Sequence, residues 1–149
     1  MKENNFYPII EELIAESDFT GNIKQKNKQL EDIRKLIQAG TIPEWMTIQF
    51  TQMQAQYPQG SDLRLRSSSN SEALENFNGA GLYSSLVHFA AEGPIEETIK
   101  RVWASLWTLR AFTEREFHKI DHRAIAMGIE FLATTDGVLK IMQARPWLD

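Results

Sequence analysis

The sequence contains no cysteine, which excludes disulfide bonds, thiolate catalysis and zinc–thiolate sites. No apolar run approaches the roughly 20 residues that a helix needs to cross a bilayer. Residues 1–5 are polar and lack the apolar stretch of a signal peptide. We therefore expect a soluble, cytoplasmic protein that has no membrane partner.

Basic residues are not in excess, because 16 Lys and Arg stand against 20 Asp and Glu and the net charge is -4. A protein that coats DNA or RNA needs a basic surface, so we expect no nucleic-acid partner, although a local basic pocket for a phosphate compound stays possible. The glycine patterns of P-loop and Rossmann nucleotide sites are also absent. With 149 residues, of which 42% are hydrophobic, the chain suits one compact domain with its own core.

Apolar residues recur at helical spacing through the first third of the chain, so residues 1–60 are predicted to be a helical segment. One helix is expected to begin near residues 21–22 and to stop at Gly40, because glycine suits a helix C-terminus. Another should follow Pro43, since proline fits the first turn of a helix. The longest helix is predicted over residues 93–118, with a broad apolar face that implies burial. Residues 61–149 carry the remaining elements.

Strand signals are confined to the second part of the chain. Residues 62–66 alternate leucine with arginine, which predicts a strand with one apolar and one basic face. Residues 67–81 are rich in serine, asparagine and glycine and are predicted to be a loop. Residues 127–147 surround Asp136 and Gly137, a strong two-residue turn signal, and are predicted to form a hairpin. The expected fold is α+β, with helices packed on a small, mostly antiparallel sheet.

The register of the predicted hairpin brings polar residues together at its outer end. A two-residue turn makes Glu130 face Gln143 and Gly128 face Arg145, with facing Cβ atoms about 5 Å apart. A carboxylate beside an amide oxygen suits Mg²⁺, and an adjacent arginine suits a phosphate group. The alternative is a surface ion pair between Glu130 and Arg145, worth about 0–1 kcal/mol.

The serine-rich segment offers a second candidate site. Arg66 leads into Ser67 and Ser68, whose hydroxyl and backbone N–H groups after a strand could hold an anion. Gly79 and Gly81 follow, and glycine permits close approach of the backbone to a ligand. Taken alone, such a segment is more often an ordinary solvated connection.

The three histidines give a weaker indication. His118 and His122 have the i, i+4 spacing of a metal-binding pair, but no third ligand stands near them in the sequence. We therefore interpret them as structural or surface residues rather than as a metal site.

Three motifs resemble, in order, the nucleotide-binding domain of the phosphoenolpyruvate synthase and pyruvate phosphate dikinase family. They span residues 66–83, residues 102–115 and residues 129–146, the last ending in Gln-Ala-Arg-Pro. The resemblance implies a partial ATP-grasp-like domain that holds ATP and Mg²⁺ between lobes. In that family the phosphate of ATP passes to a histidine on a swivelling domain and then to pyruvate on a third domain. The implied partners are therefore ATP and the phosphohistidine and pyruvate-binding domains of a parent enzyme.

The resemblance also implies roles for single residues. Arg66 is similar to the family's phosphate-contacting arginine, with Ser67, Ser68, Gly79 and Gly81 beside it in the nucleotide-binding motif. Glu130 and Gln143 resemble the metal and nucleotide ligands. Arg145 resembles the arginine that stabilises charge on the transferred phosphate, so Arg66 and Arg145 are the predicted catalytic residues.

The chain departs from the family pattern in several places. Ala73 and Gly128 stand where the family has acidic residues, and a long central stretch of the domain is missing after Gly128. We therefore expect the ATP-binding portion of a phosphoenolpyruvate synthase-like phosphotransferase that does not run the whole reaction alone. The alternative is a reduced, non-catalytic relative that serves as a binding or regulatory module. A helical interaction domain unrelated to nucleotides is the weakest interpretation, because it leaves the serine segment and the hairpin cluster unexplained.

Overall fold

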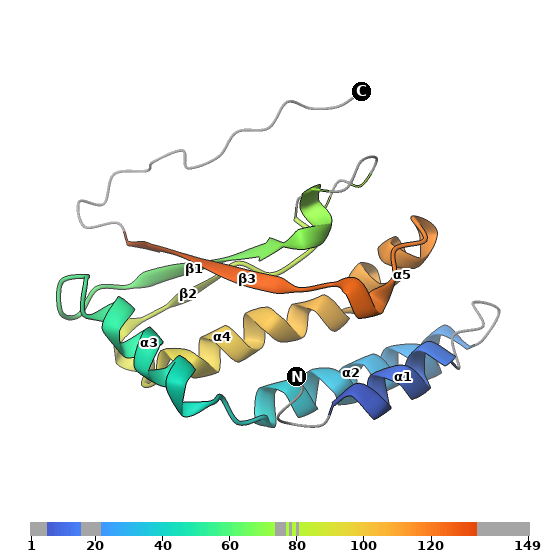
Figure 1. Cartoon of the computed structure of the whole chain (residues 1–149), viewed down its shortest axis with the longest axis horizontal. Coiled ribbons are helices and arrows are strands. Elements are labelled where there is room, and N and C mark those ends of the chain that lie inside the picture. The colour runs from blue at the N-terminus through green and yellow to red at the C-terminus, as the bar shows by residue number, and fades with distance from the viewer. Residues whose placement is uncertain (1–5, 16–21, 74–76, 78, 80, 134–149) are drawn as a thin grey trace.

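The computed structural model describes residues 6–15, 22–73, 77, 79 and 81–133. Three helices come first, α1 (Tyr7–Ala15), α2 (Ile23–Ala39) and α3 (Glu44–Gln54). They are followed by β1 (Leu63–Ser69), η1 (Asn70–Ala73), β2 (Leu86–His88), η2 (Ala90–Glu92), α4 (Ile95–Ala104), η3 (Ser105–Trp107), α5 (Leu109–Phe117), η4 (His122–Ala124) and β3 (Met127–Ala133). The strands form one antiparallel sheet in the order β2-β1-β3 (Figure 1).

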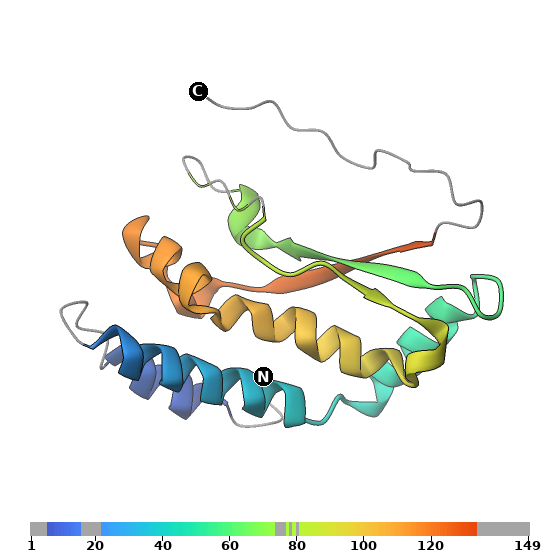
Figure 2. The same cartoon turned by 180° about the vertical axis from the view of Figure 1, so that it is seen from behind.

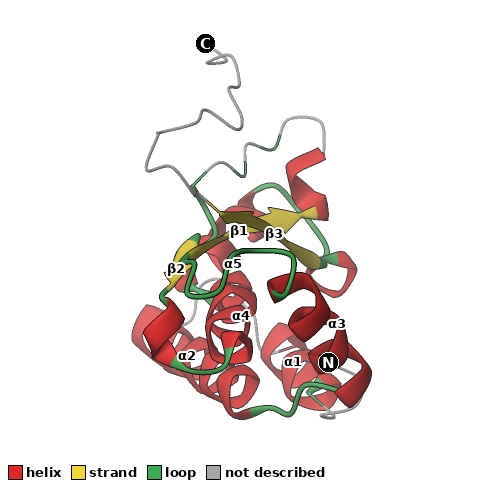
Figure 3. Cartoon of the chain, turned by 90° about the vertical axis from the view of Figure 1, so that its left-hand side faces the viewer, coloured by secondary structure: helices red, strands yellow, loops and turns green. Residues whose placement is uncertain are grey.

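Helices cover one face of this sheet. Helix α4 lies directly beneath the strands and α2 packs under α4, as Figures 1 and 2 show from opposite sides. In Figure 3 the strands lie above helices α1 to α4. Among the residues that the structure describes, no α-helix covers the other face. The α+β prediction, with helices on a small antiparallel sheet, is therefore confirmed.

The alternation of residues 62–66 determines which face is buried. Leu63 and Leu65 are almost completely buried and pack against α4, whereas Arg64 is exposed on the opposite face. The strand prediction is confirmed, because side chains of a strand point alternately to its two faces. The buried cluster beneath the sheet consists of Leu63, Leu65, Ile95, Ile99 and Val102.

The predicted single helix over residues 93–118 is wrong, because it is two helices with a break between them. Helix α4 ends at Ala104, and residues 105–107 form the tighter turn η3. Thr108 then leaves the helical conformation with ψ 151°, and its hydroxyl accepts a hydrogen bond from the Ala111 N–H at 3.2 Å. A threonine N-cap of this kind begins a new helix, so α5 takes its own direction.

The predicted loop over residues 67–81 is also partly wrong. Strand β1 continues to Ser69, and η1 follows it directly. The buried hydroxyl oxygens of Ser69 and Ser71 lie 2.8 Å apart, and Ser71 bonds in turn to the Tyr83 hydroxyl at 3.0 Å. Buried hydroxyls need such partners, and these bonds allow a serine-rich segment to be part of the core.

The first strand of the predicted hairpin exists as β3, and its partner in the described part of the chain is β1. The rest of the hairpin, from residue 134 onward, lies outside the described residues.

Helix α2 and the start of α3 lie where they were predicted, and the N-terminal helices share a core with later residues. Asn22 caps α2, Gly40 ends it, and α3 begins directly after Pro43. Leu30, Ile33 and Ile37 of α2 join Phe112 and Trp107 in one buried cluster. In the described ranges, no helix has both the length and the apolar content to cross a membrane.

Candidate functional site

The sheet face that no described helix covers, called the uncovered face below, carries two of the charged residues that the sequence singled out, Arg66 and Glu130. Arg64, Arg66 and Ser68 alternate along β1 and point to this face, opposite to Leu63 and Leu65. Across the ladder they face Leu132, Glu130 and Gly128 of β3, respectively. Two predicted site residues, Arg66 and Glu130, therefore lie directly opposite each other, although 63 residues separate them.

Arg66 and Glu130 form an ion pair on this face. The distance between Arg66 Nη1 and Glu130 Oε2 is 3.6 Å, and the side chains are 26% and 54% exposed. An ion pair this open to water contributes about 0–1 kcal/mol to stability. This ion pair itself therefore costs little to exchange for contacts with a ligand. A guanidinium is suited to phosphate oxygens and a carboxylate to a hard cation.

The neighbouring serines point to different sides of the sheet. Ser68 faces Gly128 on the same side as Arg66, and a Cβ at Gly128 would lie 3.5 Å from the Ser68 carbonyl oxygen. Ser67 faces Ile129, on the side that the helices cover. The structure thus brings Ser68 to the side of Arg66 and Glu130, and it places Ser67 on the other side.

The glycine segment is tied to the end of β1. The Tyr83 hydroxyl bonds to Ser71, and the Gly79 carbonyl accepts from the Leu82 N–H at 3.1 Å. Gly81 has φ +70°, which favours glycine, and a Cβ there would meet no described atom within 4 Å. The turn conformation thus accounts for this glycine, while its predicted role beside a ligand stays a prediction.

Gln143 and Arg145 lie outside the described residues, so their roles as metal ligand and charge-stabilising residue stay predictions. Glu130 is predicted to pair with Arg145 in the alternative reading of the hairpin, and in the structure its partner is Arg66.

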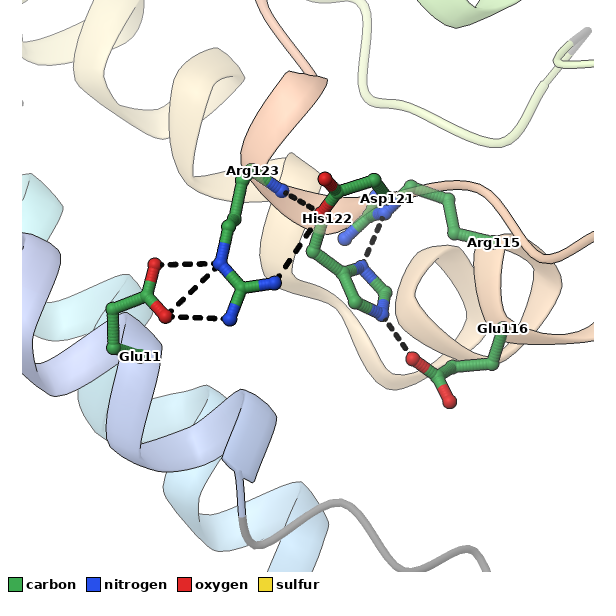
Figure 4. A network of polar contacts seen from close by, with 6 residues as sticks. All are labelled: Glu11, Arg115, Glu116, Asp121, His122 and Arg123. Atoms are coloured by element: carbon green, nitrogen blue, oxygen red, sulfur yellow. Dashed lines mark hydrogen bonds and ion pairs between the residues drawn. The ribbon is translucent and has the colours of Figure 1, made fainter.

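A buried polar cluster, which the sequence did not indicate, lies between α5 and η4 (Figure 4). Arg115 Nε donates to His122 Nδ1 at 3.0 Å, and Arg115 Nη2 donates to the Leu106 carbonyl at 2.7 Å. The opposite ring nitrogen, His122 Nε2, bonds to Glu116. The His122 ring also stacks on Phe112 with centroids 4.0 Å apart.

These contacts determine the protonation of His122. Because Nδ1 accepts from Arg115, the proton of the neutral ring is on Nε2, where it is donated to Glu116. Burial lowers the pKa of His122 below its usual value, and the charge of Arg115 acts in the same direction, while Glu116 opposes both. Both ring nitrogens are engaged, which agrees with a structural role for this histidine. Next to it, Arg123 makes a bidentate ion pair with Glu11 of α1 (Figure 4).

The residues 1–139 match the model of the family described as the pyruvate phosphate dikinase, AMP/ATP-binding domain. The chain belongs to this family. The match includes Arg66, Ser67, Ser68, Gly79, Gly81 and Glu130, and it ends before Gln143 and Arg145. The resemblance identified from the three motifs is therefore confirmed at the level of the family.

Several relatives are similar to parts of this pyruvate phosphate dikinase-type domain. A rifampicin phosphotransferase of Streptomyces is 30% identical over 65% of the chain and 11% of its own length. A phosphoenolpyruvate synthase of Aquifex aeolicus is 28% identical over 83% of the chain and 15% of its own length. Another of Aeropyrum pernix is 35% identical over 44% of the chain and 8% of its own length. The chain thus spans 8–15% of the length of these three relatives.

Proposed function

We propose that the uncovered face of the sheet binds the phosphates of Mg-ATP, as the nucleotide-binding portion of a phosphoenolpyruvate synthase-like phosphotransferase. Membership of an AMP/ATP-binding domain family supports this function. The observation that carries it is the pairing of Arg66 with Glu130 on the face that has no described helix over it. A cationic and an anionic group side by side on an open face can engage a phosphate and its metal ion together.

Arg66 is the residue proposed to hold phosphate oxygens. Its planar guanidinium offers several N–H donors, which match the geometry of a phosphate group. The strand backbone fixes its position, and the ion pair with Glu130 orients it towards β3. Ser68 adds a hydroxyl on the same face. Such positioning, together with charge, is most of what a protein contributes to phosphoryl transfer.

The residues on this face suit a magnesium ion that ATP shares. Mg²⁺ commonly takes one or two protein carboxylates and completes its coordination with substrate phosphates and water. Glu130 supplies one exposed carboxylate, and Gln143 is the predicted second ligand. In the described part of the chain, no three acidic or histidine residues gather into a group that could hold a metal ion without the nucleotide. When bound, Mg²⁺ would neutralise charge on the phosphates.

The proposed function covers ATP binding and not the whole synthesis of phosphoenolpyruvate. In this proposal the histidine that receives the phosphate and the pyruvate site belong to other domains of a parent enzyme, which are its expected partners. The chain corresponds to a small fraction of the length of its relatives, which supports this division. An ATP-grasp-like arrangement is part of the same proposal.

Calorimetric titration with Mg-ATP at low ionic strength tests this function. Loss of a hydrogen bond to a charged group costs about 1.5–3 kcal/mol, so Arg66→Gln should weaken binding by about 10- to 100-fold. Arg101→Gln is the matched control, because it removes the same charge from an exposed position on α4. Absence of binding at millimolar Mg-ATP, or equal weakening by both substitutions, would refute the proposal.

The second candidate is a reduced, non-catalytic relative that binds a partner protein. The feature that favours it is Gly128, which faces Ser68 and leaves Glu130 as the one carboxylate on that part of the described sheet face. Under this proposal the chain would be captured by a full-length enzyme of the family and would not bind Mg-ATP. A pull-down with such an enzyme, done beside the titration, separates the two candidates.

A further inference from the structure

A cavity of about 470 Å³ lies on the helical side of the molecule. Its lining comes from α1, the start of α3, α4 and η4, which are far apart in the sequence. The volume falls within the roughly 300–1,000 Å³ of typical small-molecule sites. Leu63 and Leu65 point to this side of the sheet, whereas Arg66 points to the other, so the cavity is separate from the candidate nucleotide site.

The wall of the cavity is largely aromatic and aliphatic. Trp45, Trp103 and Trp107 all line it, together with Met46 and Ile42. Soluble proteins rarely keep a large apolar surface open to water unless something binds there. Trp45 is 62% exposed, which is unusual for the largest apolar side chain. The body of a ligand for this cavity should therefore be apolar.

The apolar wall of the cavity includes the positively charged side chain of Lys100. The Lys100 side chain lines the cavity and is only 12% exposed. Its ammonium group lies 3.4 Å from the Gly40 carbonyl oxygen and 2.8 Å from Glu97, whose own side chain is 65% exposed. These two contacts use two of the three N–H donors of the ammonium group, so an anionic group inside the cavity could accept a charge-assisted hydrogen bond from the third.

An indole N–H adds a second polar feature. Trp107 is 3% exposed, and its Nε1 is buried with no hydrogen-bond partner among the residues described. A buried donor without a partner costs about 1–3 kcal/mol, and indole nitrogen can only donate. An oxygen atom of a ligand in the cavity is the kind of partner that this group lacks.

We propose that this cavity binds a small amphipathic anion, with an apolar body against the tryptophans and one carboxylate or sulfonate group against Lys100. A nucleotide does not match these walls, because several phosphate charges and a polar sugar would face mostly apolar side chains, and the second cation of the lining, Arg123, is already paired with Glu11. The site is thus additional to the ATP site proposed above and does not depend on it.

Binding of decanoate and of decanol to the unmodified protein tests the proposal. The two ligands share an apolar chain and differ in the charge of the head group. Three of the four tryptophans line the cavity, so tryptophan fluorescence reports occupancy, and displacement of anilinonaphthalene sulfonate gives the affinities. We expect saturable one-to-one binding, with decanoate held about tenfold more tightly than decanol because of its charge-assisted bond.

Two substitutions locate the ligand. Lys100→Met keeps the aliphatic stem and should reduce the tenfold preference for decanoate to about one. Lys35→Met, the control, removes an exposed lysine of α2 outside the cavity and should keep the preference. Ala126→Phe enlarges an exposed residue that lines the cavity and should reduce the affinity for both ligands at least tenfold.

The outcomes that would overturn the proposal are distinct from those for the ATP site. Equal affinity for decanoate and decanol in the unmodified protein would exclude the role of Lys100, and this comparison needs no variant. Unsaturable binding, or binding that Ala126→Phe leaves unchanged, would exclude the cavity. Displacement of decanoate by Mg-ATP would make the cavity the nucleotide site and would overturn the separation of the two sites.

Discussion

The buried His122 predicts how the stability of the protein depends on pH. Arg115 donates a hydrogen bond to His122 Nδ1, so a proton can be added to that nitrogen only if this hydrogen bond is lost. Burial lowers the pKa of His122 in the folded protein, whereas in the unfolded chain the ring titrates at its usual value near 6.5. The unfolded state therefore binds more protons than the folded state as the pH falls below 6.5.

The sign and the size of the effect follow from this difference. The contribution of His122 to the free energy of unfolding is complete above pH 6.5 and is lost as the pH falls towards the lowered pKa. The slope cannot exceed about 1.4 kcal/mol per pH unit, and between pH 6.5 and 5.5 the loss is at most about 1 kcal/mol. Glu116 and Asp121 favour the protonated ring and so oppose the lowering of the His122 pKa, which makes the loss of stability smaller than this maximum.

Urea unfolding between pH 7.5 and 5, followed by circular dichroism, measures this dependence. His122→Asn is the variant of choice, because asparagine can still accept a hydrogen bond from Arg115 and does not titrate. His88 and His118 are present in both proteins, so the difference between the two curves isolates His122. We expect the unmodified protein to lose more stability than the variant below pH 6.5. Parallel curves, or a smaller loss in the unmodified protein, would refute a neutral buried His122.

Three further substitutions test the fold through the free energy of unfolding in urea. Ile99→Ala removes a fully buried side chain beneath the sheet and should cost about 2–5 kcal/mol; a cost under 1 kcal/mol would contradict its place in the core. Thr108→Ala should cost about 0.5–2 kcal/mol through loss of the cap of α5. The exposed Thr113→Ala in the same helix is its control and should have a smaller effect. Gly81→Ala places a side chain at φ +70° and should cost about 1–2 kcal/mol, and an unchanged stability would show that the turn relaxes freely.

Local signals were sufficient for most of the elements. Apolar residues at helical spacing, with Asn22 and Gly40 near the ends, predicted α2 to within two residues of its bounds. The alternation from Leu63 to Arg66 predicted both the strand and the face that it buries. These features depend on neighbours in the sequence, since capping and alternation act over a few residues.

The errors have a common physical origin. The apolar pattern continues across residues 105–108, so nothing in its period indicated that Thr108 leaves the helix to cap α5. Serine and asparagine usually mark loops, yet Ser69 and Ser71 are buried because each finds a hydroxyl partner. In both places a side-chain hydrogen bond decided the backbone conformation, and a hydrophobic pattern does not record such bonds.

The sequence by itself determined α2, the alternating strand β1 and, through three motifs in order, the family of the chain. Only the tertiary structure decided that Arg66 faces Glu130, that His122 is buried on Arg115, and that Lys100 stands in an apolar cavity. Arg66 and Glu130 come from β1 and β3, His122 and Arg115 come from η4 and α5, and the lining of the cavity comes from elements that are far apart in the sequence. Contacts of this kind depend on register and packing between elements, which the local pattern of a single sequence does not contain.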